Sequence, residues 1–172
     1  MMSKKVILYI AMSLDGFIAR KNGSIDWLDK FNNSGEDMGY TDFIKPIDVV
    51  IMGDTTYQQI LGFDCDYPYK NQKGYVFSNK KTGKDENVTF VSGDIKELID
   101  KLEGNIWLVG GANLVNQFIK SNLIDELIIF TMPVLLGEGI RLFEETNKEL
   151  PLVLTKTKSY KIGVIESHYE RT

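Results

Sequence analysis

Asn105-Ile106-Trp107-Leu108-Val109-Gly110-Gly111-Ala112-Asn113 is the stretch of sequence that decides the fold. Its first half, residues 105–109, predicts a buried strand. Residues 112–120 predict a helix, because their apolar side chains recur with a period of about 3.6. A helix N-terminus offers free N–H donors and a partial positive charge, and glycine lets the backbone come close to a ligand. The glycine pair between strand and helix therefore predicts a phosphate-binding turn.

A second junction of the same kind is Met52-Gly53-Asp54-Thr55-Thr56. It joins a strand predicted over residues 48–52 to a short helix predicted over residues 55–61. Ligands bind at the carboxyl ends of parallel strands, so the two junctions can hold two parts of one dinucleotide. The alternative is that both glycines serve only the turns, with Asp54 as an ordinary helix N-cap. The chain has no G-x-G-x-x-G and no Walker A sequence, which excludes the standard Rossmann fingerprint.

Strands and helices alternate along most of the chain. Further strands are predicted over residues 6–12, 17–19, 74–78, 88–91 and 125–132, further helices over residues 37–44 and 94–102, and a long loop over residues 20–36. Residues 150–160 and 163–170 predict a closing antiparallel hairpin. The pattern predicts an α/β fold with a mostly parallel central sheet, helices on both faces and an antiparallel C-terminal edge, in a single domain over residues 1–172.

The composition narrows the choice of partner and compartment. Hydrophobic residues make up 43% of the chain and charged residues 26%, as in a globular protein. A net charge of -4 does not suit a nucleic-acid partner, which needs clustered Lys and Arg. The apolar run behind residues 1–5 is too short for a signal peptide or a membrane span, and a single cysteine, Cys65, suits a reducing compartment. We therefore expect a cytoplasmic protein that binds a small molecule and neither a membrane nor a nucleic acid.

Metal and hydrolase chemistry are not indicated. With one histidine, His168, and one cysteine, the chain cannot assemble a zinc site of the His/Cys type, so no metal is expected. His168 is interpreted as a residue of the last strand. No G-x-S-x-G nucleophile elbow is present. Most carboxylates in and beside the long loop are interpreted as solvated, and one of them could serve as a proton donor.

Five short motifs follow one another along nearly the whole chain. They are Ser13-Leu14-Asp15-Gly16 within residues 10–19, then Trp27, then Met52-Gly53 with Thr56-Tyr57, then Val109-Gly110-Gly111, then Pro133-Val134-Leu135-Leu136-Gly137 with Gly139. This order resembles the dihydrofolate reductase superfamily. Within it, the first and last motifs are most similar to the branch that contains the C-terminal reductase domain of the bacterial bifunctional riboflavin biosynthesis protein.

The resemblance implies a reductase that uses NADPH, and it assigns cofactor-binding residues by position. Ala11 and Ile18 would line the nicotinamide pocket, under a mobile loop of residues 20–27. Gly53, Thr55 and Thr56 would bind phosphate at a helix start. Ser78 and Asn79 would lie near the adenosine ribose. The pyrophosphate would be held by Gly110, Gly111, Ala112, Asn113 and Leu114.

One departure from the family concerns the cofactor. The arginine that usually follows Met-Gly, and that pairs with the 2′-phosphate of NADPH, is Asp54 here. A carboxylate repels a phosphate but accepts a hydrogen bond from a bare 2′-OH. Lys80 and Lys81 are alternative sources of positive charge. We expect a weakened preference for NADPH and acceptance of NADH.

The proton donor and the substrate contacts are less well defined. Counting back from Gly53 places Asp37 at the acid position of folate reductases, whereas anchoring on Phe43 places Gly39 there. Asp37 is the predicted catalytic residue, with Asp15 and Tyr40 as rivals. Asp15, Trp27 and Tyr40 are the predicted substrate contacts. The riboflavin branch binds a phosphorylated sugar. Beyond Arg20 and Lys21, the sequence shows no obvious basic cluster that could hold the sugar phosphate.

Three functions fit these observations. The leading one is an NAD(P)H-dependent reductase of a heterocyclic or ribosylamino-pyrimidine substrate, as in the 5-amino-6-(5-phosphoribosylamino)uracil reductase step of riboflavin biosynthesis. A true dihydrofolate reductase is the close alternative. A non-catalytic nucleotide-binding module on the same fold is the alternative from a different class. The resemblance also implies a homodimer, with residues 125–136 as the expected contact because of their apolar density.

Overall fold

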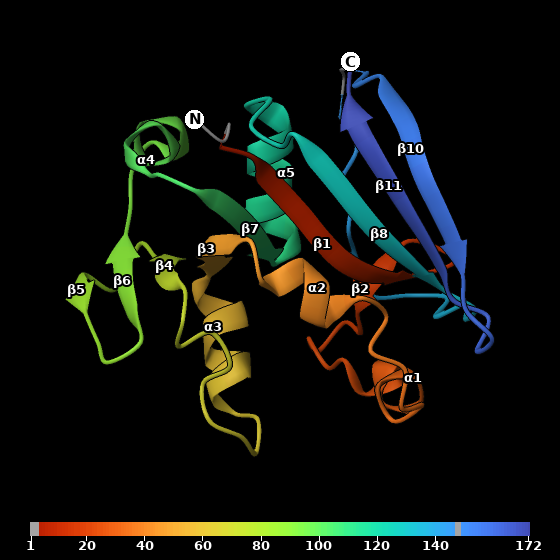
Figure 1. The fold of residues 1–172 in the computed structure, drawn as a ribbon. Helices are drawn as coiled ribbons and strands as arrows, with labels where there is room; N and C mark the ends of the chain where they lie inside the picture. The colour runs from red at the N-terminus through yellow and green to blue at the C-terminus, as the bar shows by residue number, and fades with distance from the viewer. Residues whose placement is uncertain (1–3, 147–148) are drawn as a thin grey trace.

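The computed structural model describes residues 4–146 and 149–172, so residues 1–3 of the N-terminal lead-in lie outside the described part. Nine strands form one sheet in the order β10-β11-β8-β1-β7-β3-β4-β6-β5, seen in Figure 1. These strands are β1 Val6–Ser13, β3 Ile47–Gly53, β4 Lys73–Phe77, β5 Gly83–Lys84, β6 Val88–Val91, β7 Asn105–Gly110, β8 Glu126–Met132, β10 Leu152–Ser159 and β11 Ile165–Arg171. A second, two-stranded sheet pairs β2 Phe17–Ala19 with β9 Ile140–Arg141. The helices are η1 Asp26–Leu28, α1 Asp29–Asn32, α2 Tyr40–Ile44, α3 Asp54–Leu61, α4 Ile95–Lys101 and α5 Ala112–Lys120.

The central part of the sheet is parallel. β1 pairs in parallel with β7 and β8, and β3 pairs in parallel with β7 and β4. The C-terminal edge of the sheet is antiparallel, because β11 runs antiparallel to both β8 and β10. This confirms the predicted parallel sheet with an antiparallel C-terminal edge. A short antiparallel pair of β5 and β6 at the opposite edge was not predicted.

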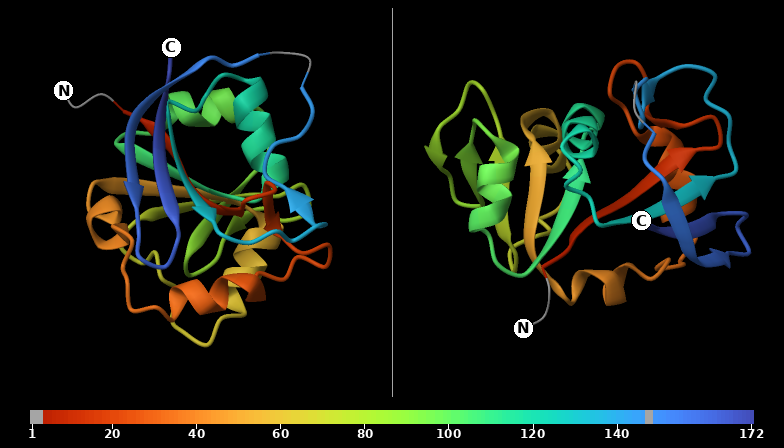
Figure 2. Two further views of the ribbon diagram at one scale, coloured as in Figure 1. Left: turned by 90° about the vertical axis from the view of Figure 1, so that its right-hand side faces the viewer. Right: turned by 90° about the horizontal axis from the view of Figure 1, so that it is seen from above.

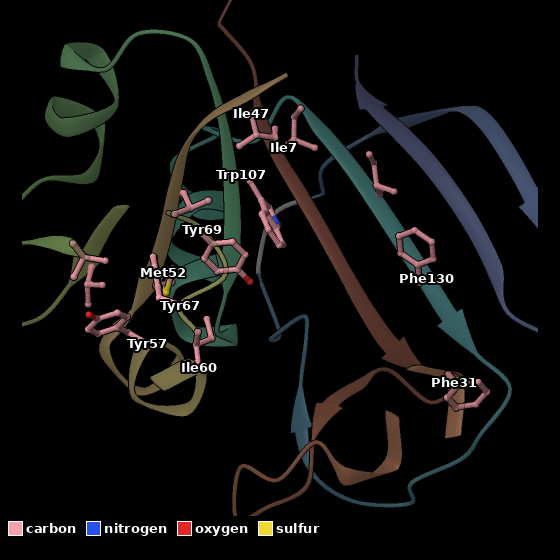
Figure 3. Packing of buried hydrophobic residues seen from close by; sticks show 14 of the residues in the cluster. Ile7, Phe31, Ile47, Met52, Tyr57, Ile60, Tyr67, Tyr69, Trp107 and Phe130 are labelled. Carbon is pink, nitrogen blue, oxygen red and sulfur yellow. The ribbon is translucent and has the colours of Figure 1, made fainter. Parts of the chain in front are cut away.

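Helices cover both faces of the sheet, as predicted, and each face has its own core (Figure 2). One core includes Tyr57 and Ile60 of α3 together with Trp107 and Phe130 of the sheet, as Figure 3 shows. The other core includes Ile95 and Ile99 of α4 and Leu114, Val115 and Phe118 of α5. Strands between two cores must be apolar on both faces, which explains why residues 49–52 form one apolar run.

The apolar density of residues 125–136 has the same explanation. Leu127 and Ile129 of β8 enter one core, while Ile128 and Phe130 enter the other. All four side chains are at most 6% exposed. The part of this density that residues 127–130 supply is therefore used inside the chain, whereas Leu135 is 69% exposed.

Two predicted segments differ from the structure. Residues 20–36 are not all loop, because η1 and α1 lie within them. Trp27 and Phe31 stand four residues apart, and a helical turn buries both, to 6% and 4% exposure. The helix predicted over residues 37–44 begins only at Tyr40, because Gly39 before it has a positive φ of 78°. The helical turns within residues 20–36 were not predicted because most residues of this segment are polar. The start of α2 was predicted too early because no capping residue marks it in the sequence.

Other element limits agree with the sequence more closely. α5 covers the predicted residues 112–120, and β6 covers residues 88–91. α4 begins after Asp94, whose carboxylate accepts a hydrogen bond from the Glu97 N–H, as the predicted cap requires. Within residues 4–146 and 149–172, no helix is long and apolar enough to cross a membrane.

The central strand β7 yields a prediction on stability. Leu108 is 0% exposed, so Leu108→Ala should lower the free energy of unfolding by about 2–5 kcal/mol, measured by urea denaturation. The control is Leu61→Ala, because Leu61 is 46% exposed. This substitution should change the free energy of unfolding by less than about 1 kcal/mol. Equal losses in the two variants would contradict the placement of the core.

Candidate functional site

A cleft of about 600 Å³ opens where β3, β4 and β7 end and α3 and α5 begin. This is the carboxyl edge of the parallel strands, where open α/β sheets bind their ligands. Its volume lies within the range of small-molecule sites, about 300–1,000 Å³. The residues that line it are Ile18, Ala19, Gly23, Gly53, Asp54, Thr55, Thr56, Gln59, Phe77, Ser78, Asn79, Lys80, Gly93, Gly111, Ala112, Asn113, Leu114, Gln117 and Ile140.

The structure brings the two glycine junctions together. A Cβ atom placed on Gly53 would lie 4.0 Å from the Gly110 oxygen and from the Gly111 nitrogen. A Cβ atom on Gly111 would lie 3.3 Å from Thr56 Oγ1, tighter than an ordinary contact. Gly110 has a φ of 131°, which side-chain-bearing residues rarely adopt. Glycine is therefore required where α3 and α5 approach each other.

Both helices that face the cleft begin without a side-chain cap. The N-cap residues are Gly53 for α3 and Gly111 for α5, and neither helix has a side-chain cap hydrogen bond. α4 contributes nothing to the cleft lining and is capped by its own Asp94. Uncapped N–H groups of a helix carry partial positive charge and accept an anion readily. The arrangement is that of a site for a phosphate-bearing ligand.

Most of the residues predicted to bind cofactor line this cleft. All of them do so except Ala11 and Gly110. Ala11 lies toward the carboxyl end of β1 and packs against the core that contains Trp107. Gly110 ends β7 directly before Gly111, which does line the cleft.

The charged residues of the cleft are partly neutralised. Lys81 Nζ lies 2.9 Å from Asp54 Oδ1, and their side chains are 40% and 28% exposed. Ser78 Oγ accepts hydrogen bonds from the N–H groups of Lys80 and Lys81, at 3.2 and 3.1 Å. The Ser78 hydroxyl thereby keeps its own hydrogen for another acceptor. Lys80 lines the cleft beside this group.

Six lining residues were not identified from the sequence: Ala19, Gln59, Phe77, Gly93, Gln117 and Ile140. Gln59 and Gln117 lie one helical turn beyond Thr55 and Asn113, so i+4 spacing was the signal for them. Gln117 Nε2 donates to Asn113 Oδ1 at 2.6 Å. Phe77 and Gly93 lie at or just beyond the ends of β4 and β6, and would have been found by applying the strand-end rule to every parallel strand.

Asp37, the predicted proton donor, does not line this cleft. It is exposed, and its carboxylate accepts hydrogen bonds from the backbone N–H and the hydroxyl of Thr41, both at 3.0 Å. These bonds tie the carboxylate to the first turn of α2. Its chemistry stays a prediction.

Tyr40 belongs to an aromatic group on the sheet face that α2 covers. Its ring lies 6.3 Å from Tyr9 and 6.0 Å from Trp107, and Tyr9 stacks on Phe43 at 4.0 Å. Burial raises the pKa of Tyr40 above its ordinary value. Tyr40 is therefore a neutral, half-buried phenol.

Trp27 is 6% exposed, and its indole Nε1 has no hydrogen-bond partner among the described residues. An unpaired buried donor costs about 1–3 kcal/mol, so a water or a ligand group is expected to accept from it. Trp27 does not line the cleft, and its role in substrate contact stays a prediction.

Asp15, the remaining predicted substrate residue, joins the first and last sequence motifs. Its carboxylate accepts hydrogen bonds from Ser13 Oγ at 2.5 Å, Gly137 N at 2.7 Å and Leu136 N at 3.1 Å. These bonds, led by the one from Ser13, hold the pKa of Asp15 below its usual range. In this structure Asp15 fixes the end of β1 to the loop after β8.

His168 lies in the last strand, β11, as predicted. Its Nε2 is 2.5 Å from Glu166 Oε1 and its Nδ1 is 3.4 Å from Glu126 Oε1. It takes no part in the cleft. In the described part of the chain, no group of three or more His, Cys, Asp and Glu side chains is placed to hold a metal ion.

The fold and the cleft define a protein of the dihydrofolate reductase-like class. The structure superposes on a dihydrofolate reductase from Enterococcus faecalis complexed with NADP(H), with a TM-score of 0.68 over 98% of this chain and 96% of that one, at 17% identity. At that identity the likeness shows the fold alone.

The family follows from closer matches. The RibD C-terminal domain profile matches residues 4–165, and the chain belongs to that family. It is 44% identical to the uncharacterized protein YwjB of Bacillus subtilis (strain 168) over 175 residues, covering 99% of both chains. A candidate riboflavin biosynthesis protein from Shewanella sp. PV-4 superposes with a TM-score of 0.89 at 32% identity, over 98% of this chain and 99% of that one.

The Asp15 bonds predict a pH-dependent stability. A carboxyl group with a lowered folded-state pKa stabilises the fold above its unfolded-state pKa of about 3.9, and loses that contribution as the pH falls through the folded-state value. Asp15→Asn should therefore lower the urea midpoint near neutral pH, and the difference from the unsubstituted protein should shrink below about pH 4.

Asp66→Asn is the control for this measurement, because Asp66 is 91% exposed in its ion pair with Lys70. It should leave the midpoint nearly unchanged. A midpoint difference for Asp15→Asn that does not depend on pH would show that the carboxylate charge is not what holds the loop.

Proposed function

We propose that this protein is a nicotinamide-dependent reductase of a small heterocycle, as membership of the RibD C-terminal domain family suggests. One observation carries the proposal: two helices with glycine N-caps and no side-chain caps open on one cleft. Family membership alone supports an oxidoreductase. The cleft adds a place for the two linked phosphates of a dinucleotide. A reducing cytoplasm, which the single cysteine suits, is the proposed location.

The residues present fit such a cofactor along the whole cleft. Thr55, Thr56, Ala112 and Asn113 stand at the two helix starts, where the pyrophosphate would lie. The polar end, with Ser78, Asn79 and Lys80, suits an adenosine ribose, and the apolar Ile18 and Ala19 suit a nicotinamide ring. The bare glycine backbones leave the space that the phosphates need.

When bound, a reduced nicotinamide supplies a hydride to a C=N or C=O carbon. The chain's own part is to orient the ring, to exclude water with apolar side chains such as Ile18, and to supply a proton. Asp37 stays the proposed proton source, although Thr41 occupies its carboxylate in this structure.

The proposed substrate class is a pyrimidine of the ribosylamino type, as in riboflavin biosynthesis. The test is cofactor oxidation by the full-length protein with NADPH and either 5-amino-6-(5-phosphoribosylamino)uracil or dihydrofolate. We expect turnover of the pyrimidine. Turnover of dihydrofolate alone would favour a true dihydrofolate reductase. Cofactor binding without turnover of either compound would favour a non-catalytic nucleotide-binding module.

The phosphate site predicts a loss of affinity on removal of one hydroxyl. Thr56→Val keeps the side-chain shape at the α3 start but deletes the hydroxyl that faces Gly111. A hydrogen bond to a charged group is worth about 1.5–3 kcal/mol, so the Kd for NADPH, measured by calorimetry, should rise at least about tenfold. Thr89→Val on β6, outside the cleft, is the control. An unchanged Kd in Thr56→Val would place the pyrophosphate elsewhere.

We further propose that the protein discriminates weakly between NADPH and NADH. Asp54 lines the cleft in the first turn of α3 and has one carboxylate oxygen paired with Lys81. The pair cancels the charge that would otherwise attract or repel a 2′-phosphate. In this proposal the second carboxylate oxygen accepts a hydrogen bond from a ribose hydroxyl, which is how carboxylates favour NADH.

Removing the charge of Asp54 should shift the cofactor preference toward NADPH. In Asp54→Asn, Lys81 is released from its ion pair, so the ratio of kcat/KM for NADPH to that for NADH should rise about tenfold. Asp100→Asn is a matched control, because Asp100 pairs with Lys96 at 3.0 Å on α4, away from the cleft. A strong NADPH preference in the unsubstituted protein, unmoved by Asp54→Asn, would overturn the proposal.

A further inference from the structure

One buried polar side chain of α5 does not line the cleft. Asn116 is 1% exposed, and α5 buries it together with Leu114, Val115 and Phe118. An apolar residue is the ordinary choice at such a position, because a buried amide must find hydrogen-bond partners and asparagine is a weaker helix former than leucine. The partners of the Asn116 amide indicate what it is used for.

These partners lie on two different parts of the chain. Asn116 Nδ2 donates to the backbone oxygen of Ala112 at 2.7 Å, in the first turn of the same helix. It also donates to the backbone oxygen of Leu142 at 2.9 Å, and Asn116 Oδ1 accepts a hydrogen bond from the Glu144 N–H at 3.0 Å. One side chain thus joins the start of α5 to the segment of residues 142–144.

That segment continues from β9, which forms one wall of the cleft. Ile140 of β9 pairs with Ala19 of β2, and both residues line the cleft beside Ile18. Two residues further on, the side chain of Leu142 is buried, and its N–H donates to the Gly16 oxygen at 2.9 Å. β2 and β9 form a sheet of their own, separate from the nine-stranded sheet. The position of this β2–β9 wall therefore depends on the contacts of the segments that flank it.

Other polar contacts of these segments lie closer to the solvent. Lys120 of α5 pairs with Glu144 at 3.3 Å, and their side chains are 56% and 47% exposed. Lys21 pairs with Glu138, with side chains that are 68% and 69% exposed. Exposed ion pairs contribute little to stability, whereas hydrogen bonds in the low-dielectric interior are stronger. The buried bonds of Asn116 are therefore the firmer attachment.

We propose that Asn116 sets the position of the β2–β9 wall relative to the phosphate site at the start of α5. The inference rests on the proposed function, in which the phosphates lie at Ala112 and the nicotinamide ring lies against Ile18 and Ala19. A single turn of α5, about 5–6 Å of stiff helix, separates the phosphate end from the amide. Asn116 acts through Ile140 and does not itself line the cleft, so it is a positioning residue.

A shift of the β2–β9 wall changes the fit of the ring and not that of the phosphates. Apolar contacts weaken steeply when a gap of less than about 1 Å opens between two surfaces. Hydride transfer also needs the reacting atoms about 3–3.5 Å apart, so a small displacement slows it strongly. The N–H groups at the start of α5 belong to the helix itself and stay where they are.

The test compares two ligands in one variant. Asn116→Leu keeps the branching of the side chain and removes all three hydrogen bonds. The ligands are NADPH and 2′-phospho-ADP-ribose, which has the same phosphates and riboses but no nicotinamide ring. The Kd for NADPH, measured by calorimetry, should rise at least about tenfold, while the Kd for 2′-phospho-ADP-ribose should change by less than about twofold.

Ile140→Ala supplies a second readout, at a residue that is 38% exposed and lies outside both cores. It should also raise the Kd for NADPH alone. The double variant with Asn116→Leu should raise this Kd by less than the product of the two single effects, because Asn116 acts through this wall. If circular dichroism shows Asn116→Leu to be unfolded, Asn116→Ser replaces it in the same comparison.

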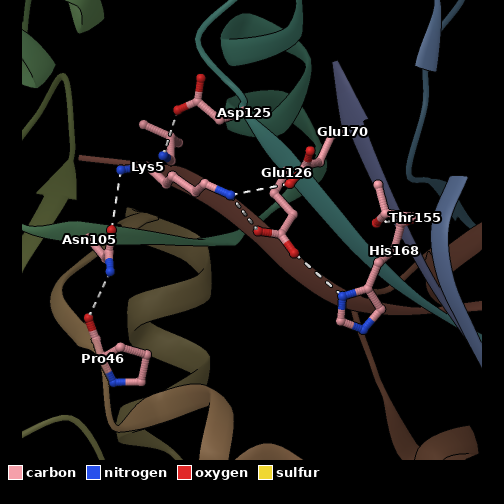
Figure 4. Close-up of polar contacts among 9 residues, drawn as sticks. Lys5, Pro46, Asn105, Asp125, Glu126, Thr155, His168 and Glu170 are labelled. Atoms are coloured by element: carbon pink, nitrogen blue, oxygen red, sulfur yellow. Dashed lines mark hydrogen bonds and ion pairs between the residues drawn. The ribbon is translucent and has the colours of Figure 1, made fainter. Parts of the chain in front are cut away.

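Asn105→Leu is the matched control. The Asn105 amide also joins two backbone segments, since it accepts from Lys5 N at 3.3 Å and donates to the Pro46 oxygen at 3.2 Å, but it lies at the end of β7 away from the cleft (Figure 4). Both Kd values should stay unchanged in this variant.

Equal rises of the two Kd values in the Asn116 variant, or no rise in either, would overturn the positioning role, as would independent effects of Asn116 and Ile140. A different result marks a failure of the proposed function itself. In that case the unsubstituted protein binds neither NADPH nor 2′-phospho-ADP-ribose, and the positioning role is lost with it.

Discussion

Two helices that start without a side-chain cap impose the central constraint on this molecule. Gly53 and Gly111 leave the first N–H groups of α3 and α5 unpaired by any cap side chain. Placed side by side, these two partial positive charges favour the binding of an anion between them. Glycine suits this close approach, since Gly110 has a φ of 131° and a Cβ on Gly111 would lie 3.3 Å from Thr56 Oγ1. The cleft and the proposed cofactor site both follow from this one arrangement.

The rest of the fold holds that arrangement in place. β3 and β7 are neighbours in the parallel sheet, so their carboxyl ends bring the two helix starts to the same edge. A separate core lies under each face, and the strands between are apolar on both sides. Asp15 then ties the end of β1 to the loop after β8, joining two motifs that are 121 residues apart. Two of the five short sequence motifs thus line the cleft, through Gly53, Thr56 and Gly111, and the first and last motifs meet at Asp15.

Much of the fold and of the cleft could be predicted from the sequence, because the sequence signals for them are local. Strand-glycine-helix junctions, the Asp94 cap and the apolar runs each depend on a few consecutive residues, and the parallel sheet with its antiparallel edge was predicted from them. The helical turn around Trp27 and Phe31 was missed because only two apolar residues mark it in a polar segment. The ion pair of Asp54 with Lys81 could not be derived, because it joins residues 27 positions apart across two elements. Asp37, chosen by counting back from Gly53, does not line the cleft, and its role as proton donor stays a prediction.

The central claim is that the unpaired N–H groups at the two helix starts hold the phosphates of a dinucleotide. It is tested most directly by a titration of the ¹⁵N-labelled protein with NADPH, followed through the backbone amide resonances. The account predicts that the largest shifts fall together on Thr55 and Thr56 of α3 and on Ala112 and Asn113 of α5, while the capped start of α4 at Ile95 does not move. Shifts centred on another part of the sheet, or on only one of the two helix starts, would contradict it.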